Sequence, residues 1–330
     1  MGTPVDPTPA VVRAALAAAA DAPGYPLTAG TPALRAVVAG WLSARHGVTG
    51  LDPAAVLPTI GSKELVAALP RLLGLGAGDR VVLPEIAYPT YDVGARLAGA
   101  ESVRSDGLLG LGPAAVGLVW LNSPSNPTGR VLPPEHVRKV VDWARERGVV
   151  VASDECYLDF GWEDTPRSVL HPEVCGGDHT GLLAVHSLSK RSNLAGYRAG
   201  FVAGDPALVA RLLEVRKHSG LIVPAPVQAA MVAAYSDEGH VAEQRARYAA
   251  RRARLRAALG SVGFAVEHST AGLYLWATRG EDCWASLAWL AERGVLVTPG
   301  VVYGPAGERH VRIAFTAADE RVDAAVRRLA

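Results

Sequence analysis

Short apolar runs alternate with helical patterns along residues 55–205, and this alternation constrains the fold more than any other feature of the chain. Amphipathic stretches such as Glu64–Leu73 and Pro134–Arg147 separate several of the runs. Strands that alternate with helices form a mostly parallel sheet that is covered by helices on both faces. The predicted strands are Ala55–Thr59, Arg80–Leu83, Val116–Leu121, Val149–Ser153, Leu182–His186 and Ala199–Ala203.

The pattern changes after Pro226, where a long arginine-rich helix over Val241–Leu259 is predicted. It is followed by short strands and one helix, which indicates a smaller α+β domain. We therefore expect a large domain over residues 21–235 and a small domain over residues 236–330. Residues 1–20, with a surface helix over Val11–Ala20, are expected to pack on the small domain. The later elements are predicted at Phe264–Glu267, Leu273–Ala277, Trp284–Arg293 and His310–Phe315.

Charge and composition exclude several classes of protein. The formal net charge is +1 over 330 residues, which gives no general electrostatic reason to bind nucleic acid or an anionic membrane. No apolar run reaches the ~18 residues of a membrane-spanning helix. The three cysteines, Cys156, Cys175 and Cys283, lie far apart, which argues against a disulfide framework or a zinc site. A reducing cytoplasm is the expected compartment.

Five polar turns each follow a predicted strand. In open α/β sheets, ligands bind at the carboxyl ends of the strands, so these turns are expected to meet at one site. The turns are Gly61–Lys63, Pro84–Pro89, Asn122–Gly129, Ser153–Tyr157 and His186–Lys190.

The first turn, Gly61-Ser62-Lys63, places a glycine and a hydroxyl where a strand gives way to a helix. Free backbone N–H groups and the positive helix end make such a turn suited to a phosphate. The alternative is an ordinary helix start that Ser62 caps. The turn is not a P-loop, because GxxxxGK[ST] is absent, and no GxGxxG occurs either.

Asp154 ends the apolar strand Val149–Ser153, and a carboxylate there is costly unless it meets a cation. The alternative is an aspartate that caps a helix. Two prolines fix the loop around Asn126, although a turn of this composition also arises without function. Tyr157 follows three residues after Asp154 and is either a site residue or part of the core.

Lysine chemistry has four candidates in this chain, Lys63, Lys139, Lys190 and Lys217. Lys190 lies beside two hydroxyls, in Ser187-Leu188-Ser189-Lys190. One interpretation is the SxxK motif of serine acyl-enzymes, which also needs KTG, and no KTG occurs. The other is a lysine that forms a Schiff base with an aldehyde cofactor. Arg312, in an apolar stretch, is either a carboxylate-binding fork or a strand-edge arginine in water.

Taken in order, the phosphate turn, the Asn loop, the Asp, the Lys and the late Arg resemble the fold-type I pyridoxal-phosphate aminotransferases of the class I/II group. The resemblance covers essentially the whole chain, and its most specific parts are SNPTG, SDECY and SLSKRSNLAGYRAG. It implies an α/β fold with a mostly parallel central sheet and a smaller α+β carboxyl-terminal domain. It also implies pyridoxal 5'-phosphate as cofactor.

The resemblance assigns a role to each matched residue. Lys190 would hold the cofactor and move a proton, Asp154 would pair with the pyridinium nitrogen, and Tyr88 would stack on the ring. Asn126 and Tyr157 would hydrogen-bond the phenolate oxygen, and Arg312, assisted by Asn126 and beside Gly2, would bind the substrate carboxylate. Residues expected at the phosphate are Gly61, Ser62, Lys63, Ser187, Ser189, Arg198 and, from the other subunit, Tyr25. A homodimer with shared active sites follows from the last of these.

Longer stretches, such as IGSKELVAALP and RKHSGLIVPAPVQAAM, resemble the actinobacterial N-succinyldiaminopimelate aminotransferases. These enzymes exchange an amino group between glutamate and N-succinyl-2-amino-6-oxopimelate. Classical aspartate aminotransferases contribute an arginine from the partner at a position that falls near Ser219 in this chain, so a dedicated fork for an aspartate side chain is not evident. Aspartate or alanine aminotransferase, a C–S lyase and a non-catalytic cofactor-binding protein remain alternatives. The candidate cations for the distal carboxylates are Lys63, Arg191, Lys217, His218 and Arg279.

Overall fold

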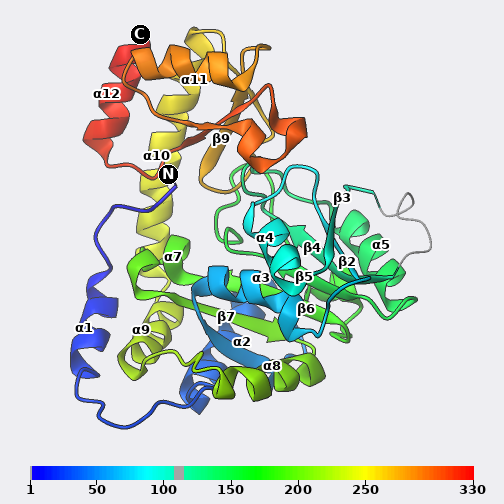
Figure 1. Cartoon of the computed structure of the whole chain (residues 1–330). Coiled ribbons are helices and arrows are strands. Elements are labelled where there is room, and N and C mark those ends of the chain that lie inside the picture. The colour runs from blue at the N-terminus through cyan, green and yellow to red at the C-terminus, as the bar shows by residue number, and fades with distance from the viewer. Residues whose placement is uncertain (1, 108–114) are drawn as a thin grey trace.

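The computed structural model describes residues 2–107 and 115–330, and a seven-stranded sheet forms its centre (Figure 1). The spatial order is β1-β7-β6-β5-β4-β2-β3, and β7 alone runs antiparallel to its neighbours within these described residues. The strands are β1 (Val56–Ile60), β2 (Arg80–Leu83), β3 (Glu101–Arg104), β4 (Val116–Asn122), β5 (Val150–Asp154), β6 (Leu182–Ser187) and β7 (Ala199–Gly204).

Helices cover both faces of this sheet, as the strand–helix alternation predicts. Alternate residues of a strand point to opposite faces. In β4, Leu118 and Trp120 pack into one apolar core, whereas Val119 and Leu121 pack into the other. The helices of this domain are α2 (Pro32–His46), α3 (Gly61–Leu72), α4 (Thr90–Ala98), α5 (Pro134–Arg145), α6 (Pro172–Cys175), α7 (Leu188–Arg191), α8 (Pro206–His218) and α9 (Ala225–Ser236).

The second sheet, with order β10-β11-β9-β8, is antiparallel and lies with its helices at the other end of the molecule (Figure 1). The long helix α10 (Gly239–Ser261) packs on α12 (Asp319–Leu329) and encloses a separate core around Tyr248, Leu275 and Phe315. The other elements are β8 (Ala265–Glu267), β9 (Tyr274–Thr278), α11 (Cys283–Glu292), β10 (Thr298–Pro299) and β11 (Val311–Ala314).

Two predictions about elements need correction. The sequence does not predict β3, because Val103 is the one apolar residue of Glu101–Arg104, which lies at the edge of the sheet with Glu101 exposed and the other three residues half-buried. The expectation that residues 1–20 pack on the small domain is wrong for α1 (Ala10–Ala18), which lies against α9 of the large domain (Figure 1). The reason is apolar burial, since Val12 joins the core that holds Met231. Only the preceding segment, through Asp6, binds α10.

Candidate active site

A cavity of about 410 Å³ lies at the carboxyl edge of the large sheet, where its loops meet the small domain. The five turns meet there because β1, β2, β4, β5 and β6 point the same way, so their carboxyl ends share one edge. The predicted site residues that line the cavity are Gly2, Ser62, Lys63, Tyr88, Asn126, Asp154, Tyr157, Ser187, Ser189, Lys190, Arg198 and Arg312.

The phosphate turn has the geometry of a close cradle. Gly61 has φ of +69°, and a Cβ atom built on it would lie 2.1 Å from Nη2 of Arg198. Only glycine accepts both the left-handed conformation and this approach. Ser62 does not cap α3, because the residue at the cap is Ile60 and makes no side-chain hydrogen bond, so the ordinary capping interpretation is wrong. Nearby, the Ser187 hydroxyl donates to the Ser189 hydroxyl at 2.9 Å.

Asp154 ends β5 as a buried carboxyl group that faces the cavity. Burial raises its pKa, although hydrogen bonds from Cys156 and Tyr91 act in the opposite direction. Tyr91 donates its hydroxyl to Oδ2 at 2.9 Å, and the Cys156 N–H donates to Oδ1 at 3.2 Å. A buried carboxylate gains most from a cation in contact with it, so Asp154 suits a protonated ring nitrogen.

Lys190 lies on the short helix α7, and its Nζ donates to the Gly2 carbonyl oxygen at 2.6 Å. The Ser187 hydroxyl bonds to Ser189 and not to Lys190, so the arrangement that a serine nucleophile needs is not formed. The geometry therefore favours the Schiff-base interpretation of this lysine over the acyl-enzyme one.

Arg312, on β11, is 9% exposed, so the interpretation as a strand-edge arginine in water is wrong. Its Nη1 donates to the Asn126 side-chain oxygen at 2.9 Å, and its guanidinium lies 4.1 Å from the ring centre of Tyr274. Tyr274 also shares a 2.9 Å hydrogen bond with the hydroxyl of Tyr157. Burial raises the pKa of Tyr157, and Tyr274 adds to that shift, so the Tyr157 hydroxyl stays protonated.

Several residues of this site are not predicted from the sequence. Tyr91 binds Asp154, whereas Cys156, Tyr274 and Tyr303 line the cavity. Cys156 lies within the Ser153–Tyr157 turn, and Tyr91 lies two residues after the Pro84–Pro89 turn. Their closeness to these turns is the sequence signal that could have identified them. Tyr274 and Tyr303 come from the small domain, and no local pattern distinguishes them from core aromatics.

Other predicted residues lie elsewhere. Tyr25 is 99% exposed on this chain and does not line the cavity. Of the candidate cations for distal carboxylates, only Lys63 lines it. Arg191 is buried against Asp159 at 3.1 Å, Lys217 pairs with Glu214, and Arg279 pairs with Glu281 at 3.5 Å. His218 lies at the end of α8 and outside the lining.

Within residues 2–107 and 115–330, no group of three or more His, Cys, Asp or Glu side chains is arranged to hold a metal ion. No helix in that part of the chain is both long and apolar enough to cross a bilayer.

The family model described as "Aminotransferase class I and II" matches residues 2–329. A probable aminotransferase of Mycobacterium tuberculosis is 67% identical over 329 residues, which is 100% of this chain and 79% of that protein. The transaminase OxyQ of Streptomyces rimosus, named for 4-dedimethylamino-4-oxo-anhydrotetracycline, is 63% identical and is covered to 91%. An LL-diaminopimelate aminotransferase of Dehalococcoides mccartyi is 32% identical, with 100% of this chain and 89% of that protein covered.

Solved structures agree with this family. A probable N-succinyldiaminopimelate aminotransferase from Thermus thermophilus superposes with a TM-score of 0.87 at 33% identity, covering 100% of this chain and 92% of that one. BacF from Bacillus subtilis superposes with a TM-score of 0.91 at 29% identity, covering 99% and 92%. Class I and II aminotransferases depend on pyridoxal phosphate, and the cavity offers an amine, a buried carboxylate and a phosphate cradle that fit it. The chain belongs to the class I and II aminotransferases and is a pyridoxal-phosphate-dependent enzyme.

Proposed function

We propose that this aminotransferase moves an amino group between glutamate and N-succinyl-2-amino-6-oxopimelate. The observation that carries the proposal is a pair of cationic side chains, Lys63 and Arg312, in the lining of one cavity that also holds Lys190. Within the part of the chain that the structure describes, Lys63 forms no ion pair with a carboxylate and lies 5.7 Å from the Tyr88 ring centre. A substrate with an α-carboxylate and a distal carboxylate needs two such cations. The likeness to the Thermus thermophilus protein supports the same substrate class.

When bound, pyridoxal phosphate supplies an electron sink for the pair left by the substrate Cα–H bond. The residues that would hold it fall into three groups. Asp154 would pair with the ring nitrogen, whereas Asn126 and Tyr157 would donate to the phenolic oxygen and Tyr88 would stack on the ring. The backbone N–H groups of Gly61, Ser62 and Lys63 and the side chains of Ser187, Ser189 and Arg198 would donate to the phosphate, which leaves the Lys63 side-chain amine for the substrate.

Lys190 would act twice in the reaction. Its amine would hold the cofactor aldehyde carbon at rest. Once substrate has displaced it, the same amine would take the proton from the substrate Cα atom and deliver a proton to the cofactor carbon. Its position on a four-residue helix between the Ser187 turn and Arg198 would keep it within reach of both atoms.

Arg312 would orient the substrate by a bidentate bond to the α-carboxylate. Asn126 accepts from Nη1, and the Tyr274 ring lies beside the guanidinium, so few rotamers remain open to it. Fixing the carboxylate fixes which Cα substituent faces Lys190, and that alignment supplies much of the rate.

We also propose a homodimer in which Tyr25 reaches the phosphate of the partner subunit. Its 99% exposure on the isolated chain leaves the side chain free to make such a contact. Two-fold symmetry would then place one Tyr25 in each active site.

A second acceptor deserves a test because of one comparison. OxyQ, which is 63% identical, is named for a ketone on a tetracycline ring system. A polycyclic ketone carries no distal carboxylate for Lys63. Aspartate or alanine aminotransferase, a C–S lyase and a non-catalytic protein are the remaining alternatives.

The test is kcat/KM for each acceptor at fixed glutamate, measured on wild type and on Lys63→Gln. N-succinyl-2-amino-6-oxopimelate should exceed oxaloacetate, pyruvate and the 4-oxo-anhydrotetracycline. Lys63→Gln should lower efficiency with the pimelate by about tenfold, which is one lost charge-assisted bond, and leave pyruvate nearly unchanged. Equal or better efficiency with oxaloacetate or the tetracycline would overturn this substrate, and elimination of sulfide from cystathionine would favour the lyase.

A further inference from the structure

Residues 2–8 form a segment without helix or strand, here called the strap, that leads from the active-site cavity past α10 toward α1 (Figure 1). At one end the Gly2 carbonyl oxygen accepts a hydrogen bond from the Lys190 amine, and Gly2 and Thr3 line the cavity. The fit there is tight, because a Cβ atom on Gly2 would lie 2.2 Å from Cε1 of Tyr274. The position of the strap therefore determines part of the cavity wall.

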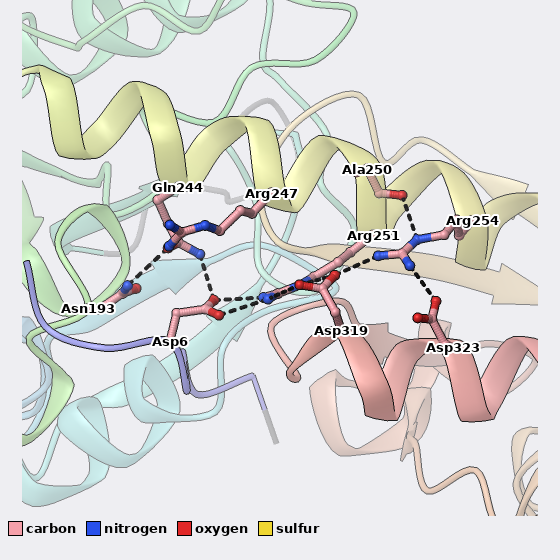
Figure 2. Close-up of polar contacts among 9 residues, drawn as sticks. All are labelled: Asp6, Asn193, Gln244, Arg247, Ala250, Arg251, Arg254, Asp319 and Asp323. Atoms are coloured by element: carbon pink, nitrogen blue, oxygen red, sulfur yellow. Dashed lines mark hydrogen bonds and ion pairs between the residues drawn. The ribbon is translucent and has the colours of Figure 1, made fainter.

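The other end is held by Arg251, a residue of α10 whose side chain is 1% exposed. Its two terminal nitrogens donate to the two Asp6 carboxylate oxygens at 2.7 and 2.8 Å, a bidentate pair. The same guanidinium donates to Asp319 of α12 from Nε at 3.2 Å and from Nη2 at 3.0 Å. Figure 2 shows the guanidinium between the strap and the two small-domain helices.

The strap is also tied to the large domain close to Lys190. Gln244 donates to Asp6 at 2.7 Å and accepts from Asn193 at 3.2 Å (Figure 2). Asn193 follows α7, the helix that carries Lys190, and its amide donates to the Pro7 carbonyl at 3.4 Å. Asp6 thus stands where the strap, the small domain and the Lys190 segment meet.

We propose that Arg251 is a positioning residue that, through Asp6, holds the strap across the two domains so that Gly2 and Thr3 form a wall of the substrate cavity. Four residues of extended chain span at most about 14 Å, so a fixed Asp6 leaves the Gly2 end little freedom. The inference rests on the proposed function, because the wall acts on the amino-acid substrate that enters beside Lys190 and Arg312.

The chain offers a matched control on the same helix. Arg254 also donates to Asp319, at 2.6 Å, and it pairs with Asp323, but it makes no bond to Asp6. Removing Arg254 weakens the contact between α10 and α12 and leaves the strap attached.

The experiment compares Asp6→Asn, Arg251→Gln, their double variant and Arg254→Gln as holoenzymes. Hydrogen exchange should accelerate over residues 3–8 in the first three variants. Their KM for glutamate should rise about fivefold to tenfold with kcat within about twofold, because the lost contact binds the ground state and the transition state equally. The effects of the two single changes should not add in the double variant, because both break one contact. The visible absorption of bound cofactor should not change, and Arg254→Gln should resemble wild type in every measurement.

Faster exchange of the strap with an unchanged KM would overturn the proposal that Gly2 and Thr3 form a wall of the substrate cavity. Unchanged exchange would overturn the proposal that the Arg251–Asp6 pair, here called the clamp, holds the strap. An equal rise of KM in Arg254→Gln would assign the effect to general loosening of the small domain. Where Arg251→Gln folds poorly, Asp6→Asn carries the test, because it keeps the shape of the side chain. A wild type without transamination would refute the proposed function, whereas the exchange measurement would still judge the clamp.

Discussion

At the scale of single residues, Gly61 has both a left-handed backbone conformation and a close approach to Arg198, and comparison with a second glycine separates the two effects. Gly61→Ala should reduce affinity for pyridoxal phosphate by about tenfold or more, because its Cβ displaces Arg198 and also strains the backbone at φ of +69°. Gly74→Ala is the control, since Gly74 has φ of +78° with open space around it. The measurement is cofactor titration by fluorescence. An equal loss of affinity in both variants would mean that Arg198 is not held by this contact.

Lys190 is one of four lysines, so its role can be compared with others on the same chain. Lys190→Ala should lose the visible absorption of lysine-bound cofactor and nearly all turnover, by at least about 10³-fold, because the variant lacks the amine proposed to hold the cofactor and to move the proton. Lys139→Ala, on the exposed face of α5, should behave as wild type. Borohydride reduction followed by peptide mapping should label Lys190, and a label on another lysine would refute the assignment.

The third residue is Arg312, where geometry matters more than charge. Arg312→Lys keeps the positive charge and loses the fork and the contact with Asn126. Efficiency with glutamate should fall by about 10²-fold, while the cofactor spectrum stays close to that of wild type. Half-reaction kinetics would measure this. Unchanged efficiency would make Arg312 a structural arginine.

At the scale of elements, α10 and α12 are joined by ion pairs whose strength depends on pH. Hydrogen bonds from Arg251 and then Arg254 lower the pKa of Asp319 to about 2. A lowered pKa stabilises the fold above the unfolded-state value of about 4, and that contribution is lost as pH falls toward 2. The Asp319 side chain is 49% exposed, so solvent reduces the effect.

Asp319→Asn should therefore lower Tm at pH 6 by about 1–3 °C, and the difference from wild type should shrink below pH 4. Thermal melts at pH 6, 4 and 3 would measure it. A difference that does not change with pH would show that the carboxylate charge at this position contributes nothing to stability.

At the scale of the whole molecule, the proposed dimer makes a prediction about hybrids. Tyr25→Phe and Lys190→Ala subunits, each weak or inactive alone, should regain up to about a quarter of wild-type activity after mixed refolding, because half of the dimers are hybrids with one intact site. Size measurement should give two chains per particle. If Tyr25 acted within its own subunit, no hybrid would contain an intact site and activity would stay at the level of the separate variants.

The strand–helix order of the large domain and several residues at its ligand-binding edge could be predicted from local sequence. Strand–helix alternation is a local signal, and parallel strands bring their carboxyl ends together, so Asp154 and Lys190 could be predicted to meet. The class of enzyme followed from the resemblance of its ordered motifs to a known family, and the family model agrees.

Several features depend on contacts between distant parts of the chain and could not be predicted from local sequence. The packing of α1 on α9, the edge strand β3, and the contacts of Tyr274 and Tyr303 depend on residues far away in the chain. The clamp on Asp6 joins residues 245 positions apart. Such contacts form because the whole chain buries apolar surface and pairs its buried charges at once, and no short window of sequence contains both partners.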